Sequence, residues 1–531
     1  MLANAQPKCE DHAKPLYSRD LKSANRASST HPDPPMAVRA PDFRPELEWI
    51  NTGGRRLSLA DFRGQVLVLD FWTYGCINCI HMIPELRELE RRFPDEVVVV
   101  GVHSGKFINE RDSANIARAC ERLGVDHPVL NDWQFRTWRE YTVNAWPTLV
   151  VVSPTGYDLG SYAGEILATE LAPILEGILA DARAAGTLGT GTPFPRGEPA
   201  ASAPTPGVLR FPAKVHAAEG RLFVSDTGHH RLLEVALDED GRTGRVVRVF
   251  GSGKAGWRDG GADEAMFRAP HGLALAGNTL YVANTENHLV RAVDLGTGEV
   301  RTVAGTGAQA RRRSTDGPTL ATPLNSPWDL LWKDGGLYVA MAGPHQLWRI
   351  DPATGQAEVF TGSGAEELYD APLPMAALAQ PSGLATDGSR IFFADAEASA
   401  IRYALPGAET GTVVGTGLFD FGDRDGVGDD VRLQHALGVA WWEAEGVLLV
   451  ADTYNHRIKR VDPATREARA FAGTGERGLV DGATDEARFW EPGGISIAPD
   501  GKRAYVADTN NHALRVIDLA SGRVDTVELR E

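Results

Sequence analysis

The chain has 531 residues and a formal net charge of −17 at pH 7, with 43% hydrophobic and 24% charged residues. A single hydrophobic core does not grow to this size, so we expect at least two domains. The negative charge argues against nucleic acid as a partner, because phosphate binding needs clustered lysines and arginines. There is no apolar run long enough to span a membrane and no apolar signal-peptide core, which favours a cytoplasmic protein without membrane contact.

The first segment, residues 1–39, is polar and holds few large apolar side chains, which predicts a disordered tail. Met36 offers a second possible start of translation, so these residues could also be a mis-called start. The intact mass of the natural protein distinguishes the two interpretations.

Residues 40–186 alternate between strand-like and helix-like segments, which predicts an α/β domain with crossover connections. Apolar runs rich in valine and leucine predict buried strands at 65–72 and 97–103, and 148–156 reads as a third strand with its turn. Apolar residues at intervals of three and four predict helices after residue 79, at 113–124 and at 168–186.

Cys76 and Cys79 follow the first of these strands directly and lie where a helix begins. Backbone N–H groups at a helix N-terminus stabilise a thiolate, and a thiolate is the species that attacks a disulfide. We therefore expect Cys76 to be the nucleophile and Cys79 to be the resolving thiol.

Two other interpretations of this pair stay open. A structural zinc site needs two further ligands, and Cys9 and Cys120 are isolated from each other, so we predict no metal and no cofactor besides a Cys76–Cys79 disulfide. The pair could also be two packed cysteines without chemistry, which is the role that we expect for Cys120.

The segment VLVLDFWTYGCINCIHMIP resembles the active-site region of thioredoxin-fold proteins. The segment between VVVVGVH and the Trp–Pro loop is longer than in minimal thioredoxin and resembles the TlpA-like branch, which carries an extra helix and strand there. The resemblance implies that Asp70 is a buried acid that relays a proton for Cys79, and that Pro84 kinks the helix. It also implies a cis-proline loop at Trp146–Pro147, with Pro147 shaping the substrate groove. We expect that groove to be lined by Trp72, Tyr74, Ile77, Asn78 and Trp146. The pair Ile77–Asn78 departs from the Gly–Pro of thioredoxin, which leaves the redox potential undecided.

A thiol peroxidase is a further alternative, because Thr73 and Cys76 have the T-x-x-C spacing of peroxiredoxins. Leu69 stands where those enzymes carry a proline, and a resolving cysteine three residues on is not their usual arrangement. A reactive thiolate at this position could still be oxidised by peroxide.

Residues 187–207 are rich in Pro, Gly, Ala, Ser and Thr, which predicts a linker. Beyond it, in 208–531, six related segments recur with 54 to 58 residues between equivalent positions. Those positions are Asp226, Asn284, Met341, Asp395, Asp452 and Asp508. Six copies of a four-strand unit at this period predict a six-bladed β-propeller.

Five histidines also occupy one repeat position: His230, His288, His345, His456 and His512. Equivalent positions on different blades lie too far apart to share an ion, so we expect a structural turn. In that turn the Asp should cap backbone donors and the Asn should take the left-handed conformation. The turn, together with the recurring Gly–Thr–Gly, resembles NHL repeats.

The whole order, an α/β thioredoxin-like fold followed by an all-β six-bladed propeller, resembles the NHL-repeat-containing thioredoxin-like family. The resemblance implies a thiol–disulfide oxidoreductase that meets a protein client or a reductase through the cysteine pair. The propeller would bind a protein partner. The alternative is a non-enzymatic scaffold in which the thioredoxin domain is vestigial.

Overall fold

The computed structural model describes residues 38–189, 207–311 and 316–531. Most of the predicted tail and linker therefore lies outside the described residues. Val38 and Arg39 are an exception, because they form strand β1 (Val38–Arg39) paired with β7, so the prediction of disorder is wrong for these two residues. The described residues form two compact units, one of residues 38–106 and 110–189, the other of residues 207–311 and 316–531 together with 107–109.

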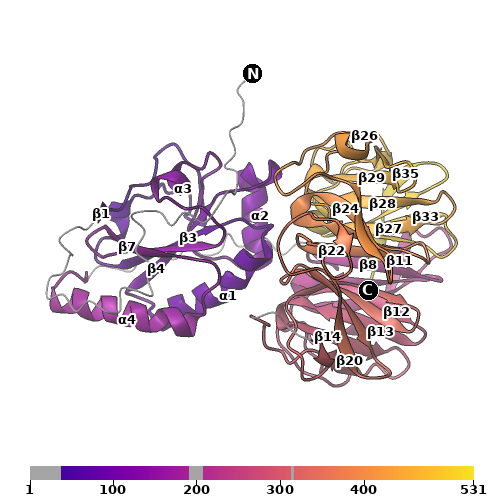
Figure 1. Cartoon of the computed structure of the whole chain (residues 1–531), viewed down its shortest axis with the longest axis horizontal. Coiled ribbons are helices and arrows are strands. Elements are labelled where there is room, and N and C mark those ends of the chain that lie inside the picture. Colours follow the sequence, from indigo (N-terminus) through magenta and orange to yellow (C-terminus); the bar gives the residue numbers. More distant parts are fainter. Residues whose placement is uncertain (1–37, 190–206, 312–315) are drawn as a thin grey trace. The chain divides into compact units, whose positions relative to one another are not determined.

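The first unit is built on a seven-stranded sheet with the order β1-β7-β6-β3-β4-β5-β2 (Figure 1). The central strands β3, β4 and β5 run parallel, whereas β6 is antiparallel to β3 and β7 is antiparallel to β6. Strands β3, β4 and β6 are buried along their whole length, as their valine-rich and leucine-rich sequences predict. The strands are β2 (Trp49–Ile50), β3 (Val66–Trp72), β4 (Val97–His103), β5 (Val129–Asn131), β6 (Thr148–Val152) and β7 (Tyr157–Ala163).

Helices cover this sheet and divide its core into two layers. The apolar faces of α1 and α4 pack on the side of the sheet that carries Val66 and Val68. The side that carries Leu67, Leu69 and Phe71 packs against α3 and the segments before β3. The helices are α1 (Ile77–Arg92), α2 (Ser113–Leu123), α3 (Arg136–Glu140) and α4 (Ala168–Ala184), with 3₁₀ turns at η2 (Leu59–Phe62) and η3 (Asn109–Arg111).

The second unit consists of six antiparallel sheets, one for each predicted repeat, and forms the propeller in Figure 1. The first blade consists of β8 (Pro212–Ala218), β9 (Arg221–Asp226), β10 (Arg231–Leu237) and β11 (Thr243–Phe250). The second consists of β12 (Pro270–Ala276), β13 (Thr279–Asn284), β14 (Leu289–Asp294) and β15 (Val300–Ala304). The third consists of β17 (Pro327–Lys333), β18 (Gly336–Met341), β19 (Gln346–Asp351) and β20 (Gln356–Thr361).

The fourth blade consists of β22 (Pro381–Thr386), β23 (Ile391–Asp395), β24 (Ala400–Ala404) and β25 (Glu409–Val414). The fifth consists of β27 (Gly438–Trp442), β28 (Val447–Asp452), β29 (Arg457–Asp462) and β30 (Glu467–Ala472). The sixth consists of β32 (Pro492–Ile497), β33 (Arg503–Asp508), β34 (Ala513–Asp518) and β35 (Arg523–Thr526). Short strands add to the outer edges of blades three to six: β16 (Gly317–Pro318), β21 (Ala371–Pro372), β26 (Gly426–Val427) and β31 (Gly482–Ala483). On the first blade, β36 (Glu528–Arg530) pairs parallel with β11, so the end of the chain closes the ring.

The repeated histidine turn follows the second strand of a blade, and the structure corrects one detail of its prediction. The residue in the left-handed conformation is the histidine, with φ 53° at His288, and not Asn287 before it. The histidine is the residue that ends the 3₁₀ turn, and histidine, like asparagine, is enriched in this conformation. The 3₁₀ turns at these positions are η4 (Thr227–His229), η5 (Thr285–Asn287), η6 (Ala396–Ala398), η8 (Thr453–Asn455) and η9 (Thr509–Asn511). A further 3₁₀ turn, η7 (Gly428–Asp430), lies outside this pattern.

The turn connects each blade to the next by a hydrogen bond. Nδ1 of His230 in the first blade accepts from the N–H of Ala269 in the second, at 3.2 Å. Nδ1 of His512 in the last blade accepts from the N–H of Phe211 in the first, at 2.9 Å. The same bond recurs at His288, His345 and His456, and Ser399 Oγ takes the place of the imidazole in the fourth blade. The structural interpretation of the histidines is therefore confirmed.

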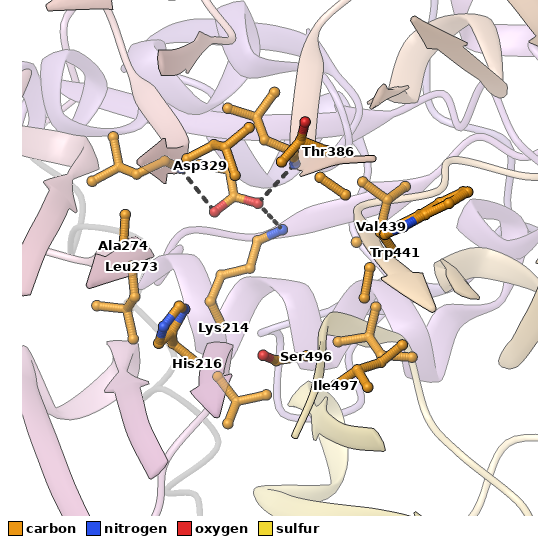
Figure 2. Close-up of a pocket in the computed structure, with 18 of the residues that line it drawn as sticks. Lys214, His216, Leu273, Ala274, Asp329, Thr386, Val439, Trp441, Ser496 and Ile497 are labelled. Atoms are coloured by element: carbon orange, nitrogen blue, oxygen red, sulfur yellow. Dashed lines mark hydrogen bonds and ion pairs between the residues drawn. The ribbon is translucent and has the colours of Figure 1, made fainter. Parts of the chain in front are cut away.

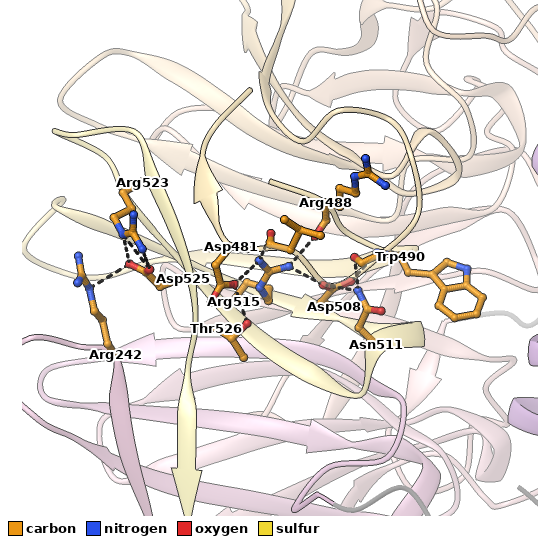
Figure 3. A network of polar contacts seen from close by, with 12 residues as sticks. Arg242, Asp481, Arg488, Trp490, Asp508, Asn511, Arg515, Arg523, Asp525 and Thr526 are labelled. Atoms are coloured by element: carbon orange, nitrogen blue, oxygen red, sulfur yellow. Dashed lines mark hydrogen bonds and ion pairs between the residues drawn. The ribbon is translucent and has the colours of Figure 1, made fainter. Parts of the chain in front are cut away.

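The aspartates of the repeat act inside their own blade, as expected. Asp508 Oδ1 accepts from the N–H of Trp490 at 2.8 Å, and its other oxygen accepts from Asn511 and Arg515 (Figure 3). The buried Arg515 also binds Asp481, which belongs to an Asp–Gly loop between two blades. Arg291 and Asp259, Arg402 and Asp370, and Lys459 and Asp425 repeat this pairing, so these loop carboxylates serve as structural acceptors.

Candidate functional site

The two cysteines differ strongly in their exposure. Cys76 is the N-cap of α1 and is partly exposed, whereas Cys79 lies one turn into the helix and is fully buried. The N–H groups of Cys79 and Ile80 both donate to the carbonyl of Cys76 at 3.1 Å, which fixes this first turn. The first turn of α1 contains no acidic residue, so no carboxylate of that turn cancels the positive end of the helix dipole next to Cys76.

Both cysteines are free thiols in this structure. Burial raises the pKa of Cys79 well above its usual value, and a hydrogen bond to Cys76 and the negative charges of Cys76 and Asp70 act in the same direction. The Cys79 thiol therefore keeps its proton until a base removes it, while Cys76 is the sulfur that a substrate can reach.

Asp70 is a carboxyl group close enough for its charge to act on Cys79. It lies in β3, is buried, and its charge acts on Cys79. Burial raises the pKa of Asp70 to about 7, although the charge of His127 opposes the shift. Its Oδ1 has no hydrogen-bond partner among the described residues. A carboxyl group with this pKa can exchange a proton near neutral pH.

The predicted proline loop is present, and the peptide bond between Trp146 and Pro147 is cis. Trp146 Nε1 donates to the carbonyl of Ser104 at 3.1 Å, and the N–H of Ser104 donates to the carbonyl of Trp72 at 3.0 Å. The proline loop and the end of β3 are therefore both attached to the residue that follows β4.

The structure does not support all the predicted groove residues. Asn78 and Trp146 are partly exposed, so a substrate could contact them. Trp72, Tyr74 and Ile77 are buried, and the prediction that they line an open groove does not fit this structure. Trp72 and Tyr74 instead pack on the ring of His103, at centroid distances of 5.1 and 5.4 Å.

Two further residues hold the loop before Cys76, and the sequence reasoning missed both. Nε2 of His103 accepts from the N–H of Tyr74 at 3.3 Å, and burial lowers the pKa of His103 to about 3, so its ring is neutral. Oε1 of the buried Glu110 accepts from the N–H of Gly75 at 3.0 Å. The sequence gives one indication of the role of His103, because a histidine ends an otherwise apolar strand. No pattern around Glu110 indicates that this residue lies at the site.

Cys120 lies in a different helix, α2. It is buried, and burial raises its pKa to about 12. The prediction of a packed core residue is confirmed, and Cys120 offers a matched control for experiments on the other two cysteines. Within the described residues, no cluster of three or more His, Cys, Asp or Glu side chains could hold a metal ion.

The propeller contains a central cavity of about 270 Å³, lined by the inner strands of all six blades (Figure 2). Lys214 projects across it from the first blade. Its ammonium donates to the carbonyls of Leu437 and Ser382, at 2.6 and 3.2 Å, and lies 3.2 Å from Asp329 Oδ2. All three N–H donors of the ammonium have a partner, so Lys214 links four blades and is not free to bind a ligand.

Comparisons with known proteins agree with this architecture. The thioredoxin-like family matches residues 64–157, and the NHL repeat family matches residues 267–292 and 489–517. NHL repeat-containing protein 2 of Homo sapiens is 38% identical over 527 residues, which cover 93% of this chain and 72% of the human protein.

Two other relatives extend the comparison. The chloroplastic protein SUPPRESSOR OF QUENCHING 1 of Arabidopsis thaliana is 39% identical over 537 residues, 97% of this chain and 49% of that protein. The thiol-disulfide oxidoreductase ResA of Geobacillus thermodenitrificans is 28% identical over 121 residues, 23% of this chain and 67% of that protein.

No helix in the described part of the chain is long and apolar enough to cross a membrane. With a thioredoxin-like domain before a six-bladed NHL propeller, and with this identity over most of both sequences, the chain belongs to the family of NHL repeat-containing protein 2.

Proposed function

We propose that the chain is a thiol–disulfide oxidoreductase that acts on protein disulfides. The observation that carries the proposal is the asymmetry of the cysteine pair, with a partly exposed Cys76 at the helix N-terminus and a buried Cys79 beside Asp70. This arrangement separates the attacking sulfur from the resolving sulfur. The name of the ResA relative describes the same chemistry for that protein.

The reaction proceeds in two exchanges. The Cys76 thiolate attacks one sulfur of the client disulfide, the client S–S bond breaks, and the other client sulfur leaves as a thiolate. A mixed disulfide between Cys76 and the client results. Asp70 then takes the proton of Cys79, and the Cys79 thiolate attacks the sulfur of Cys76. The second client thiolate leaves, so the client gains two electrons and the enzyme holds a Cys76–Cys79 disulfide. A dithiol reductase or a small thiol must return the pair to the reduced form.

The NHL propeller gives the chain the capacity to bind proteins, and we propose that it recruits the client. Hydrogen bonds from the repeated turn join each of its six blades to the next. The cytoplasmic location stays a prediction, and the name of the Arabidopsis relative places that protein in the chloroplast.

Reduction of insulin by dithiothreitol tests the proposal on the full chain. The wild-type protein should accelerate the reaction, and Cys76→Ser should abolish the acceleration. Cys79→Ser should stop turnover, and when the reduced variant is mixed with insulin without dithiothreitol it should accumulate a mixed disulfide at Cys76, because the first exchange needs only that sulfur. Cys120→Ser is the matched control and should behave as wild type, since Cys120 is a buried residue of another helix.

The alternatives give other results. A wild-type rate no faster than dithiothreitol alone, without mixed disulfides in Cys79→Ser, would identify a scaffold and end the proposal. Consumption of hydrogen peroxide that depends on Cys76 and survives Cys79→Ser, without insulin reduction, would identify a thiol peroxidase instead.

A further inference from the structure

The central cavity of the propeller differs at its two ends. Lys214 and Asp329 form a floor, each at the third position of an inner strand, and both side chains are buried. The lining residues at the last two positions of these strands, such as Leu275, Trp332 and Ile497, are partly exposed. The cavity therefore has a mouth on the face of the propeller where the inner strands end (Figure 2).

Stacked rings from neighbouring blades fix the shape of this mouth. Trp332 of the third blade stacks on Tyr281 of the second, with ring centroids 5.5 Å apart and ring planes 10° apart. Trp441 of the fifth blade stacks on Phe392 of the fourth at 5.7 Å and 11°. A ligand would therefore enter a preformed site and would not have to order the side chains at its entrance.

His216 gives the cavity a polar group that the fold itself does not use. It lines the cavity from β8, and Figure 2 shows its imidazole among the other lining side chains. No described residue forms a hydrogen bond, an ion pair or a ring contact with it. Burial lowers the pKa of His216 to about 4, so the ring is neutral near pH 7, and one nitrogen can donate while the other accepts.

A hydroxyl group from the adjacent blade supplies a second polar group. Ser496 in β32 lines the same cavity, and its Oγ accepts from the N–H of Ala217 at 3.0 Å. The Ser496 O–H donates to no described residue. Polar groups inside a cavity need a partner, which is either water or the polar atom of a ligand.

The charge and the volume of the cavity limit what it can hold. Lys214 and Asp329 are the only charged residues in the described lining, and they bind each other. A charged ligand would lose its water without gaining a partner of opposite charge. The walls are largely apolar, with Leu273, Leu275 and Val439 among them. Because a cavity of about 150 Å³ holds a benzene ring, the volume of about 270 Å³ leaves room for two fused rings.

We propose that this cavity binds a small, uncharged organic molecule, about the size of two fused rings, whose polar group forms a hydrogen bond with His216. The apolar body of the ligand packs on the leucine and valine walls. Lys214 and Asp329 keep their own bonds and form the floor of the site. The inference does not depend on the cysteine pair, so Cys76→Ser should bind the ligand as well as the wild-type protein does.

Calorimetric titration of the full chain with matched bicyclic probes tests the proposal. Indole offers an N–H donor, quinoline offers a nitrogen acceptor, and both are uncharged near neutral pH. Indene has the shape of indole without a polar group, and indole-3-carboxylate adds a negative charge. Indole or quinoline should bind at one site per chain. Indene should bind more weakly, and the carboxylate should not bind, because its charge finds no partner.

Two variants examine the polar group and the mouth separately. His216→Phe keeps a ring but removes both nitrogens, so the affinity for the polar probe should fall by about fivefold, the effect of one lost hydrogen bond. The affinity for indene should not change. Leu275→Trp should fill the mouth and abolish binding of every probe. His229→Phe is the matched control, because His229 belongs to the same blade but does not line the cavity, and its affinities should equal those of wild type.

Methyl NMR of isoleucine-labelled protein locates the probe even if Leu275→Trp does not fold. The signal of Ile497 at the mouth, assigned by its loss in Ile497→Val, should shift when the probe saturates the protein. Ile116, which is buried in α2, should not respond. Failure of both indole and quinoline to bind saturably would overturn the proposal, and so would binding without a shift at Ile497. Equal losses for the polar probe and for indene in His216→Phe would show that His216 does not bind the polar group.

Discussion

Asp70 is a carboxyl group inside an otherwise apolar strand, and its burial connects stability to pH. Its pKa is about 7 in the folded chain, against 3.8 for an ordinary aspartate. Between these pH values the folded state holds a proton that the unfolded state has lost, so the free energy of unfolding falls as pH rises from about 4 to about 7. Three pKa units correspond to about 4 kcal/mol, which is an upper value for this effect.

Asp70→Asn should remove that dependence, because the amide does not titrate. At pH 8 the variant should protect the amides of β3 and β4 from hydrogen exchange better than the wild-type protein does. At pH 4 the two proteins should be nearly equal. Mass spectrometry of peptides from these strands is the right measurement, since burial also raises the pKa of Asp452 and Asp508 in the propeller and a global signal would mix the effects. Weaker protection in Asp70→Asn at pH 8 would contradict this account.

At this scale the sequence predicted the cysteine pair, the acid beneath it and the proline loop, because short motifs specify them. It did not show that Trp72 and Tyr74 pack inward on His103, since a motif does not reveal which side of a strand end is covered.

The histidine turn is the element that determines how blades are joined. His230 combines a left-handed backbone with an Nδ1 acceptor for the next blade, while its neighbour His229 pairs with Asp226 and has a side chain 38% exposed. His230→Ala should therefore destabilise the propeller by about 1 to 3 kcal/mol, because the buried N–H of Ala269 loses its partner. His229→Ala should cost about 1 kcal/mol or less.

Urea unfolding followed by hydrogen exchange of peptides from β9 to β12 distinguishes the two variants. His230→Asn should lie between them, since asparagine tolerates the left-handed backbone but does not restore the imidazole contact. Equal stability of His230→Ala and His229→Ala would show that the bond between blades contributes nothing.

The six repeats predicted the six blades and their four main strands, because each copy preserves the alternation of apolar residues. The short outer strands, such as β26 and β31, were not predicted, since a strand of two residues that begins at the glycine of an Asp–Gly pair gives no periodic signal. The left-handed residue was assigned to asparagine because asparagine and histidine are adjacent in the repeat and both adopt this conformation.

Across the whole propeller, closure depends on contacts between residues that are far apart in the sequence. Strand β36 pairs with β11, and His512 binds Phe211, so the last blade and the first are joined at two places. Lys214 and Asp329 add a connection through the centre of the ring (Figure 2). The inner strands share no residue pattern that would reveal this pair, so only the folded ring brings it together.

Lys214→Met should destabilise the propeller by about 3 to 5 kcal/mol, because it leaves the buried Asp329 without its cation. Asp329→Leu should destabilise the propeller by a similar amount, because it leaves the buried ammonium of Lys214 without its carboxylate. The double variant Lys214→Met with Asp329→Leu should recover much of the loss, since no unpaired charge remains. Calorimetric melting of the full chain, with circular dichroism to follow the sheets, measures all three. Additive losses in the double variant would show that the two residues do not act as a pair.

The central claim is that Cys76 and Cys79 exchange electrons as a pair, and a redox titration tests it most directly. The full chain is equilibrated in glutathione buffers of graded potential, alkylated, digested and analysed by mass spectrometry. We predict one two-electron transition in which the peptide that contains both cysteines loses two hydrogens, while Cys120 stays reduced throughout. A peptide that remains a dithiol at every potential, or a disulfide that involves Cys120 instead, would contradict the account.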